Sequence, residues 1–212
     1  MSRKYFGTDG IRGETNREPM TALSAIRIGM AAGLQFLQKN SSQKVLIGRD
    51  TRLSGDMLQS ALTAGFTTIG LDVVDLGIIP TPAVAILTKE LNANLGVMIS
   101  ASHNPFQDNG IKFFGPDGFK LTENVEEIIE EKINKILTPE YTSPENIGST
   151  SQLLDASEIY IQFLKKTIPT NQHFTGIKIV IDCANGAGYK AGPELLKSLG
   201  AKVFSIGIKP NG

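Results

Sequence analysis

Short apolar runs alternate with helix-like segments along the first half of the chain, and this alternation is the feature that most constrains the fold. The runs are four or five residues long and end in polar loops, while the segments between them carry apolar residues near helical spacing. Strands separated by helices in this way are typical of a layered α/β sheet. Thr21 is placed to cap the first helix. The expected strands are 44–47, 72–76 and 95–99, and the expected helices are 21–39, about 56–70, and one that starts at Thr81-Pro82 and ends at 92–94.

A hairpin is expected after the third of these strands. Asn109-Gly110 is a dipeptide typical of turns, and it precedes the apolar residues 111–114. The run 115–118, Gly-Pro-Asp-Gly, predicts a second turn that returns the chain through 119–121. Such a hairpin would brace the polar loop at 100–105.

An acidic helix and a linker follow the predicted hairpin. Residues 123–137 place Val125 and five Ile or Leu residues on one helical face, with acidic residues and Lys132 opposite. We therefore expect a helix whose acidic face is solvated. Residues 138–151 have no periodicity and contain two prolines, which predicts a linker. We divide the chain there, into domains at 1–150 and 151–212.

The segment after the linker predicts one βαβ unit. Asp155 and Glu158 have the spacing of a capping box, and they open an expected helix that runs to 168. A single βαβ unit leaves sheet faces and edges uncovered, so we expect the second domain to be incomplete in this chain. Its elements are a strand at 177–181, a helix at 188–199 and a strand at 202–206.

Composition excludes several classes of protein. The chain has 21 Lys and Arg against 21 Asp and Glu, so bulk charge attracts it neither to nucleic acid nor to a membrane. One cysteine, Cys183, excludes an intrachain disulfide framework and a four-cysteine zinc site, and two histidines do not replace the missing thiols. The apolar runs are short, and the N-terminus has no signal-peptide pattern. These features predict a soluble, cytoplasmic protein.

Ser102 is the first candidate for chemistry. It follows a buried-type strand and is flanked by His103, Asn104 and Pro105. Polar loops at strand ends are common places for sites. A hydroxyl there can act as a nucleophile or carry a phosphoryl group, while Asn104 and backbone N–H groups could donate hydrogen bonds to an anion. The same residue types also make ordinary turns, and this alternative stays open.

Four cationic residues lie near the candidate loops. They are Arg12, Arg49, Arg52 and Lys112. The planar guanidinium of arginine suits phosphate oxygens, and a desolvated lysine can take part in proton transfer. Surface ion pairing is the alternative for each of them.

Two familiar motifs do not fit. Gly186, Gly188 and Gly192 follow a predicted strand, but their spacing is not that of the dinucleotide-binding fingerprint, and no acidic residue ends the next strand. Ser102 lacks the flanking glycines of an α/β-hydrolase nucleophile elbow. A nucleotide cofactor and a serine hydrolase are therefore disfavoured.

Three segments taken together resemble the α-D-phosphohexomutase family. They are Phe6 to Gly13 (FGTDGIRG), Gly48 to Gly55 (GRDTRLSG), and Ser100 to Pro105 (SASHNP) with Asp108 to Lys112 (DNGIK). Their order along the first 120 residues matches that family, and the later DCANGAG at 182–188 also fits. The resemblance extends over essentially the whole chain.

The resemblance implies a fold, an activity and a set of residue roles. It implies an α/β chain in which a layered domain with a mixed sheet is followed by an incomplete second, related α/β domain. Members of the family interconvert the 6- and 1-phosphates of a hexose through a phosphoserine and a bisphosphate, with Mg²⁺ as cofactor. The forms of the first and third motifs favour glucosamine phosphate, on the route to UDP-N-acetylglucosamine; mannose and glucose phosphates are the alternatives.

By the same resemblance, Ser102 is the phosphoserine and binds the metal through its phosphate. Lys112 matches the acid/base lysine, and Arg12 and His103 match residues that line the phosphoserine and the substrate. Arg49 and Asn104 are the remaining candidates for phosphate binding. The partner expected is a small phosphosugar, and a homo-oligomer is left open.

The family's metal-binding, sugar-recognition and C-terminal phosphate-binding loops have no counterparts before Gly212. A magnesium site needs several carboxylate or phosphate ligands, so strong metal binding by these residues alone is not expected. We therefore expect the 212 residues alone to be inactive or nearly so. A non-catalytic structural fragment is the remaining alternative.

Overall fold

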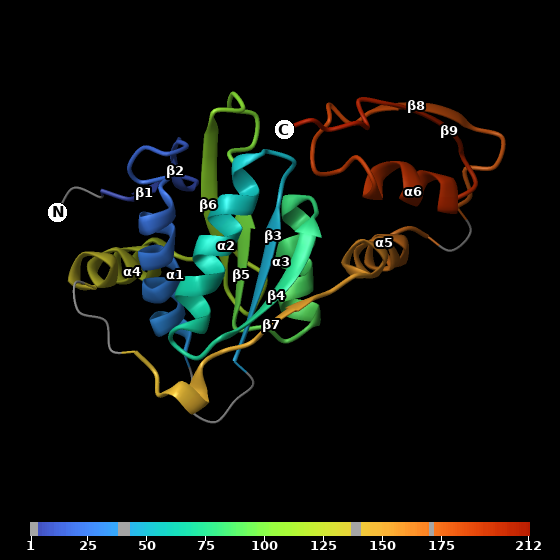
Figure 1. The fold of residues 1–212 in the computed structure, drawn as a ribbon. Coiled ribbons are helices and arrows are strands. Elements are labelled where there is room, and N and C mark those ends of the chain that lie inside the picture. The colour runs from blue at the N-terminus through green and yellow to red at the C-terminus, as the bar shows by residue number, and fades with distance from the viewer. Residues whose placement is uncertain (1–3, 38–42, 137–140, 170–171) are drawn as a thin grey trace.

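A computed structural model describes residues 4–37, 43–136, 141–169 and 172–212. Its centre is a seven-stranded sheet in the order β1-β2-β6-β5-β3-β4-β7, and β8 and β9 form a separate two-stranded sheet (Figure 1). The strands are β1 Phe6–Gly7, β2 Gly10–Glu14, β3 Lys44–Arg49, β4 Asp72–Ile78, β5 Leu95–Ile99, β6 Asp108–Phe114, β7 Thr150–Gln152, β8 Lys178–Asp182 and β9 Lys202–Ile206. The helices are α1 Ala22–Phe36, α2 Ser54–Thr67, α3 Thr81–Glu90, α4 Glu123–Lys135, α5 Ala156–Lys166 and α6 Ala191–Ser198, with a 3₁₀ turn η1 at Pro144–Asn146.

The large sheet is mixed, as expected. Strands β5, β3, β4 and β7 run parallel to one another, whereas β6 is antiparallel to both β5 and β2. The predicted hairpin is reduced to β6 and a short return segment, joined by one bridge between Phe114 and Lys120. Apart from the return strand predicted at 119–121, the predicted strands and helices are present, although the ends predicted at 38–39 and at 137 lie outside the described residues.

Helices cover both faces of the sheet. Helices α1, α2 and α4 pack with Val45, Ile47 and Val97 into one apolar core, and α3 and α5 pack with Leu46 and Met98 into another. Neighbouring residues of one strand point to opposite faces, which is why a single strand supplies both cores. As predicted, the Thr21 hydroxyl caps α1 by accepting a hydrogen bond from the N–H of Ser24 at 3.1 Å. None of the described helices is long and apolar enough to cross a lipid bilayer.

The turn predicted at Asn109-Gly110 is wrong, because both residues lie inside β6. Asn109 is fully buried, and its side-chain amide donates to the hydroxyl of Ser54 at 2.8 Å. A Cβ at Gly110 would lie 2.8 Å from the carbonyl oxygen of Ser100. The glycine is therefore explained by close packing between strands, not by a turn.

The solvated acidic face predicted for α4 is also wrong in part. Glu126 is 2% exposed and Glu130 is 8% exposed. Glu126 forms an ion pair with Lys120 at 3.0 Å, and Glu130 accepts hydrogen bonds from the backbone N–H groups of Lys4 and Phe6. Glu126 and Glu130 therefore bind the segment around Lys120 and the N-terminal residues Lys4 and Phe6 to α4.

The predicted linker contains regular structure where it is described. The 3₁₀ turn η1 lies within it, and β7 adds a parallel strand at the edge of the large sheet beside β4. Beyond it, α5 packs on the same sheet through Ala156, Tyr160 and Ile161. The division of the chain at 150 stays a prediction. Asp155 occupies the N-cap position of α5 but makes no side-chain capping hydrogen bond there, so the capping box is wrong.

The end of the described chain forms the predicted βαβ unit. Strands β8 and β9 are parallel neighbours, with α6 between them in sequence. The unit rests on the rest of the molecule through α6, whose Ala191 is buried in the core that α5 and α3 share. Three of its apolar side chains are at least 48% exposed, namely Val180, Phe204 and Ile206.

Candidate functional site

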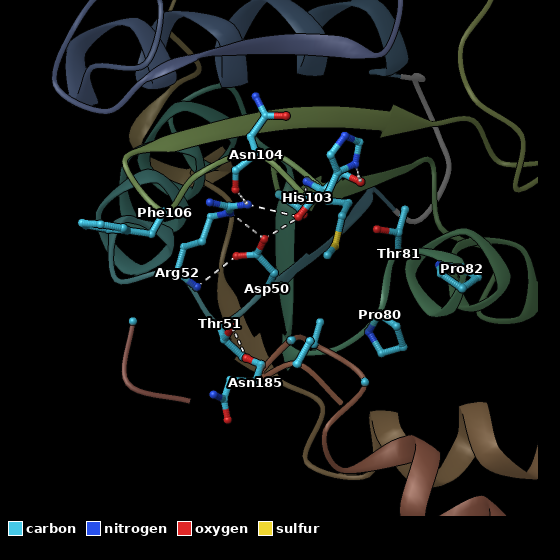
Figure 2. Close-up of a pocket in the computed structure, with 18 of the residues that line it drawn as sticks. Asp50, Thr51, Arg52, Pro80, Thr81, Pro82, His103, Asn104, Phe106 and Asn185 are labelled. Carbon is cyan, nitrogen blue, oxygen red and sulfur yellow. Dashed lines mark hydrogen bonds and ion pairs between the residues drawn. The ribbon is translucent and has the colours of Figure 1, made fainter. Parts of the chain in front are cut away.

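A pocket of about 810 Å³ opens where the loops after β3, β4, β5 and β8 meet (Figure 2). Three of these strands are parallel neighbours in the large sheet, so their C-terminal ends lie along one edge, and loops there commonly form sites. The pocket includes Ser102, His103 and Asn104 from the first unit, and Asn185 from the βαβ unit. The hydroxyl of Thr51 donates to the carbonyl of Asn185 at 2.7 Å, which joins the two sides of the pocket.

Ser102 lies at the pocket surface with its side chain exposed. Its hydroxyl oxygen is 3.3 Å from Nδ1 of His103. Its φ is +59°, which is left-handed backbone that costs a non-glycine residue about 1–3 kcal/mol. Such conformations persist only where the surroundings fix them. The hydroxyl is therefore presented to the pocket by a backbone that other groups must hold.

Asp50 and Arg52 at the end of β3 provide that support. The Arg52 guanidinium donates to backbone carbonyls of the Ser102 loop, and Asp50 forms an ion pair with Arg52 at 3.0 Å. The Ser100 hydroxyl donates to Asp50 at 2.7 Å and accepts from the N–H of Ser102 at 3.0 Å. Sequence reasoning named Arg52 only as a loop cation and missed Asp50 and Ser100; the spacing Asp-Thr-Arg after a strand was the available signal.

Arg12 and Lys112 lie together on the face of the sheet that carries the pocket. Lys112 is the register partner of Met98, which lines the pocket, and Arg12 is the partner of Gly110, two residues before Lys112. Cross-strand partners project from the same face, and alternate residues do so too. Asp9 joins the two cations, accepting from Lys112 Nζ at 2.7 Å and from Arg12. Neither cation lines the pocket itself, and Asp9 was not predicted from the sequence.

The Asp9 carboxylate has a pKa below its ordinary value of 3.8. The first cause is the hydrogen bond from Lys112, and the positive charges of Lys112, Arg12 and Lys120 act in the same direction, whereas burial opposes them. Asp9 is therefore an anion that holds two cations beside the pocket.

Arg49 lies on the opposite face of the sheet. A Cβ on its neighbour Gly48 would touch Val84 and Ile79, on the face of the sheet that α3 covers. Neighbouring residues of a strand point to opposite faces, so Arg49 points to the face that α2 covers. There Arg49 forms an ion pair with Asp56 at 2.6 Å and donates to Gln59 at 3.0 Å. The structure gives no support to phosphate binding by Arg49.

Asn104 lines the pocket, but its side-chain amide is engaged. The amide nitrogen donates to the Asp108 carboxylate at 2.9 Å, within the same loop. Its backbone N–H donates to the carbonyl of Ala101 at 3.1 Å. In this arrangement Asn104 shapes the loop, and its predicted role in phosphate binding has no direct support.

Comparison with known proteins places the chain. A family model described as "Phosphoglucomutase/phosphomannomutase, alpha/beta/alpha domain I" matches residues 3–140. The chain belongs to this phosphohexomutase family. Two relatives named phosphoglucosamine mutase, from Xanthobacter autotrophicus and Parvibaculum lavamentivorans, are 56% and 55% identical to it over 212 residues. These matches cover 100% of this chain and 47% of each relative, so the chain spans about half the length of the relatives.

Solved structures of the family share the fold. A putative phosphomannomutase from Thermus thermophilus superposes with a TM-score of 0.83 at 31% identity, over 99% of this chain and 47% of the other. The α/β class with a mixed sheet, which the resemblance implied, is confirmed.

The described residues do not by themselves form a metal site. Within the described ranges no group of three or more His, Cys, Asp and Glu side chains is placed to hold an ion. Of the acids at the Ser102 loop, Asp50 is already bound by Arg52 and Ser100, and Asp108 accepts from the Asn104 amide. A magnesium ion at this phosphohexomutase pocket would need oxygen ligands beyond these side chains.

Proposed function

We propose that the protein containing this chain interconverts glucosamine 6-phosphate and glucosamine 1-phosphate, through a phosphoserine at Ser102 and a bisphosphate intermediate. The observation that carries the proposal is the identity of 51–56% over all 212 residues to relatives named phosphoglucosamine mutase. The exposed hydroxyl of Ser102 in a pocket wide enough for a sugar phosphate supports it. This activity would supply an aminosugar 1-phosphate for UDP-N-acetylglucosamine and hence for peptidoglycan precursors.

The chemistry proposed for Ser102 is phosphoryl transfer in both directions. The phosphoserine gives its phosphoryl group to a free sugar hydroxyl, which leaves the bisphosphate and an unmodified serine. The sugar turns over within the site, and its other phosphate returns to the Ser102 oxygen. Such a transition state needs positioning and charge neutralisation more than further covalent chemistry.

The neighbouring side chains have proposed roles in this transfer. His103, at 3.3 Å, can donate a hydrogen bond to the phosphoserine. Lys112 would exchange the proton of the reacting sugar hydroxyl, and Arg12 would bind phosphate oxygens from the same face of the sheet. Asp9 supports both roles, because it holds the two cations at one place.

Magnesium belongs to this proposal as a cofactor that would neutralise the phosphate on Ser102. The described side chains supply no further cluster of ligands, so none of the steps above is assigned to the metal. For the same reason we propose that the 212 residues alone turn over little or no substrate. A cytoplasmic location and a possible homo-oligomer are predictions from the sequence.

The test is the mass of the full-length protein that contains this chain, after exposure to a hexose 1,6-bisphosphate. We expect the wild-type protein to gain about 80 Da, the mass of one phosphoryl group on serine. Ser102→Ala should abolish this gain, while Ser60→Ala, at an exposed serine of α2 that does not line the pocket, should keep it. A gain that persists in Ser102→Ala would contradict the proposal.

A second specificity is favoured by the solved relative. The Thermus thermophilus structure is titled a putative phosphomannomutase, and the matching family model covers phosphoglucomutases as well. Turnover by the full-length protein should be compared on glucosamine, mannose and glucose 6-phosphates. A kcat/KM highest for mannose would replace the aminosugar in the proposal.

A further inference from the structure

The strained Ser102 backbone is held by one side chain that the proposed reaction does not use. Arginine has five N–H donors in a planar fork. In Arg52 all five N–H donors form hydrogen bonds within this chain, and its side chain is only 10% exposed. Nε donates to Asp50, and the two terminal nitrogens donate to four backbone carbonyls of one loop. Figure 2 shows Arg52 between Asp50 and Asn104.

The four carbonyls surround the guanidinium. They belong to Ser102 at 3.1 Å, Asn104 at 2.9 Å, Pro105 at 2.7 Å and Asp108 at 3.1 Å. Carbonyls that point inward from a seven-residue loop repel one another unless a cation or donors lie between them. The loop 102–108 is therefore folded around Arg52.

The N–H side of Ser102 is fixed by the same network. Asp50 pairs with Arg52, accepts from the Ser100 hydroxyl at 2.7 Å, and leaves the Ser100 oxygen to accept from the Ser102 N–H at 3.0 Å. The N–H of Ser102 is thus bound by Ser100, which donates to Asp50, and its carbonyl is bound by Arg52. Asp50 and Arg52 both lie just after β3. This arrangement accounts for a φ of +59° at a serine.

From this geometry we infer that Arg52 is a positioning residue that holds Ser102 in its reactive orientation and does not bind phosphate. The inference rests on the proposed role of Ser102. The positive charge of Arg52 is matched by the Asp50 carboxylate, and every N–H donor of the guanidinium is already hydrogen-bonded. Arg52 should therefore affect how fast Ser102 reacts, not how tightly a phosphosugar binds.

The test compares Arg52→Lys and Ser100→Ala with a matched control, Arg17→Lys, which changes an exposed arginine that forms an ion pair with Glu14. Lysine has three donors on one atom and cannot reach four carbonyls and a carboxylate at once. In the full-length protein and each of its variants, the rate of Ser102 phosphorylation is measured against the concentration of glucose 1,6-bisphosphate. Hydrogen exchange of the peptide 100–108 is measured in parallel.

We expect Arg52→Lys to lower the maximal rate about 100-fold, as for a displaced reacting group, with little change in the half-saturating concentration. Exchange at 100–108 should rise about 10-fold, while exchange in β3 and β5 stays at the wild-type rate. Ser100→Ala should change the same two quantities in the same direction. Arg17→Lys should change neither.

A rise in the half-saturating concentration with an unchanged maximal rate would overturn the inference, because it would mean that Arg52 binds phosphate. Unchanged exchange at 100–108 in Arg52→Lys would also overturn it. If the wild-type full-length protein takes up no phosphoryl group, the proposed function fails, and the exchange measurement still decides whether Arg52 holds the loop.

Discussion

Asp9 shows how one carboxylate can organise two catalytic candidates. Its side chain is 46% exposed, whereas that of Lys112, which donates to it at 2.7 Å, is 13% exposed. Because the partner is largely buried, the pair loses more when broken than a fully solvated ion pair would. Asp9 therefore fixes the ammonium of Lys112 and the guanidinium of Arg12 on the pocket face of the sheet.

We expect Asp9→Asn to lower the free energy of unfolding by about 1 kcal/mol near neutral pH, a value kept small by solvent screening. The folded pKa of Asp9 lies below 3.8, so its stabilisation is present above that pH and is lost as pH falls through the lower folded pKa. Urea unfolding of the wild-type and Asp9→Asn proteins, in steps of about 0.5 pH unit from about pH 2.5 to about pH 7, measures the difference between their free energies of unfolding. This difference should be constant above about pH 5 and shrink below about pH 4.

The control for this experiment is Glu90→Gln, which removes an exposed carboxylate at the end of α3. A stability difference for Asp9→Asn that stays the same at low pH would rule out the ion pair as its cause.

The sequence locates the candidate serine but not the side chains that support it. A polar loop after the buried strand β5 was enough to single out Ser102 and His103. Arg49 and Arg52 belong to one motif and look equivalent in sequence. The strand's alternation sends Arg49 to the α2 face, and the chain bends after β3 so that Arg52 reaches a loop 50 residues later. Such long-range partners leave no local pattern.

At the scale of elements, periodicity predicted the helices and strands because each has an apolar face or run. It failed where burial depends on a distant segment. The acids of α4 lie opposite an apolar stripe and look solvated, but Lys4 and Phe6 donate backbone hydrogen bonds to Glu130, and Lys120 pairs with Glu126. Strand β7 has only three residues, all exposed, and exists because β4 offers it an edge.

We expect Glu130→Ala to destabilise the chain by about 2 kcal/mol, because the backbone N–H groups of Lys4 and Phe6 lose their acceptor. Glu131→Ala, one position further on the same helix, is the matched control. Its carboxylate is 68% exposed and pairs with Lys135, so a loss of about 0.5 kcal/mol or less is expected. Urea unfolding of both variants measures the two values. Equal losses in the two variants would show that the hydrogen bonds from Lys4 and Phe6 to Glu130 add nothing to the free energy of unfolding.

The whole molecule consists of two parts that differ in burial. Strand β5 is buried at every residue, whereas β8 and β9 alternate between exposed and half-buried residues. A two-stranded sheet is marginally stable unless other elements cover it. Here α6 packs against β9, and Thr51 and Asn185 provide a hydrogen bond to the first part. The pocket therefore has one wall that belongs to the well-buried sheet and one that belongs to the more exposed unit.

We therefore expect the βαβ unit to open before the large sheet does. Native-state hydrogen exchange should show β8 and β9 opening at a free energy at least ~2 kcal/mol below that of β3 and β5. A matched pair of substitutions tests the same difference. Ile47→Ala removes a fully buried side chain and should cost about 3 kcal/mol, whereas Ile206→Ala, at a residue 53% exposed, should cost less than about 1 kcal/mol. Exchange in β8 and β9 as slow as in β5 would mean that the two parts unfold as one cooperative unit, and the pocket would then have two equally rigid walls.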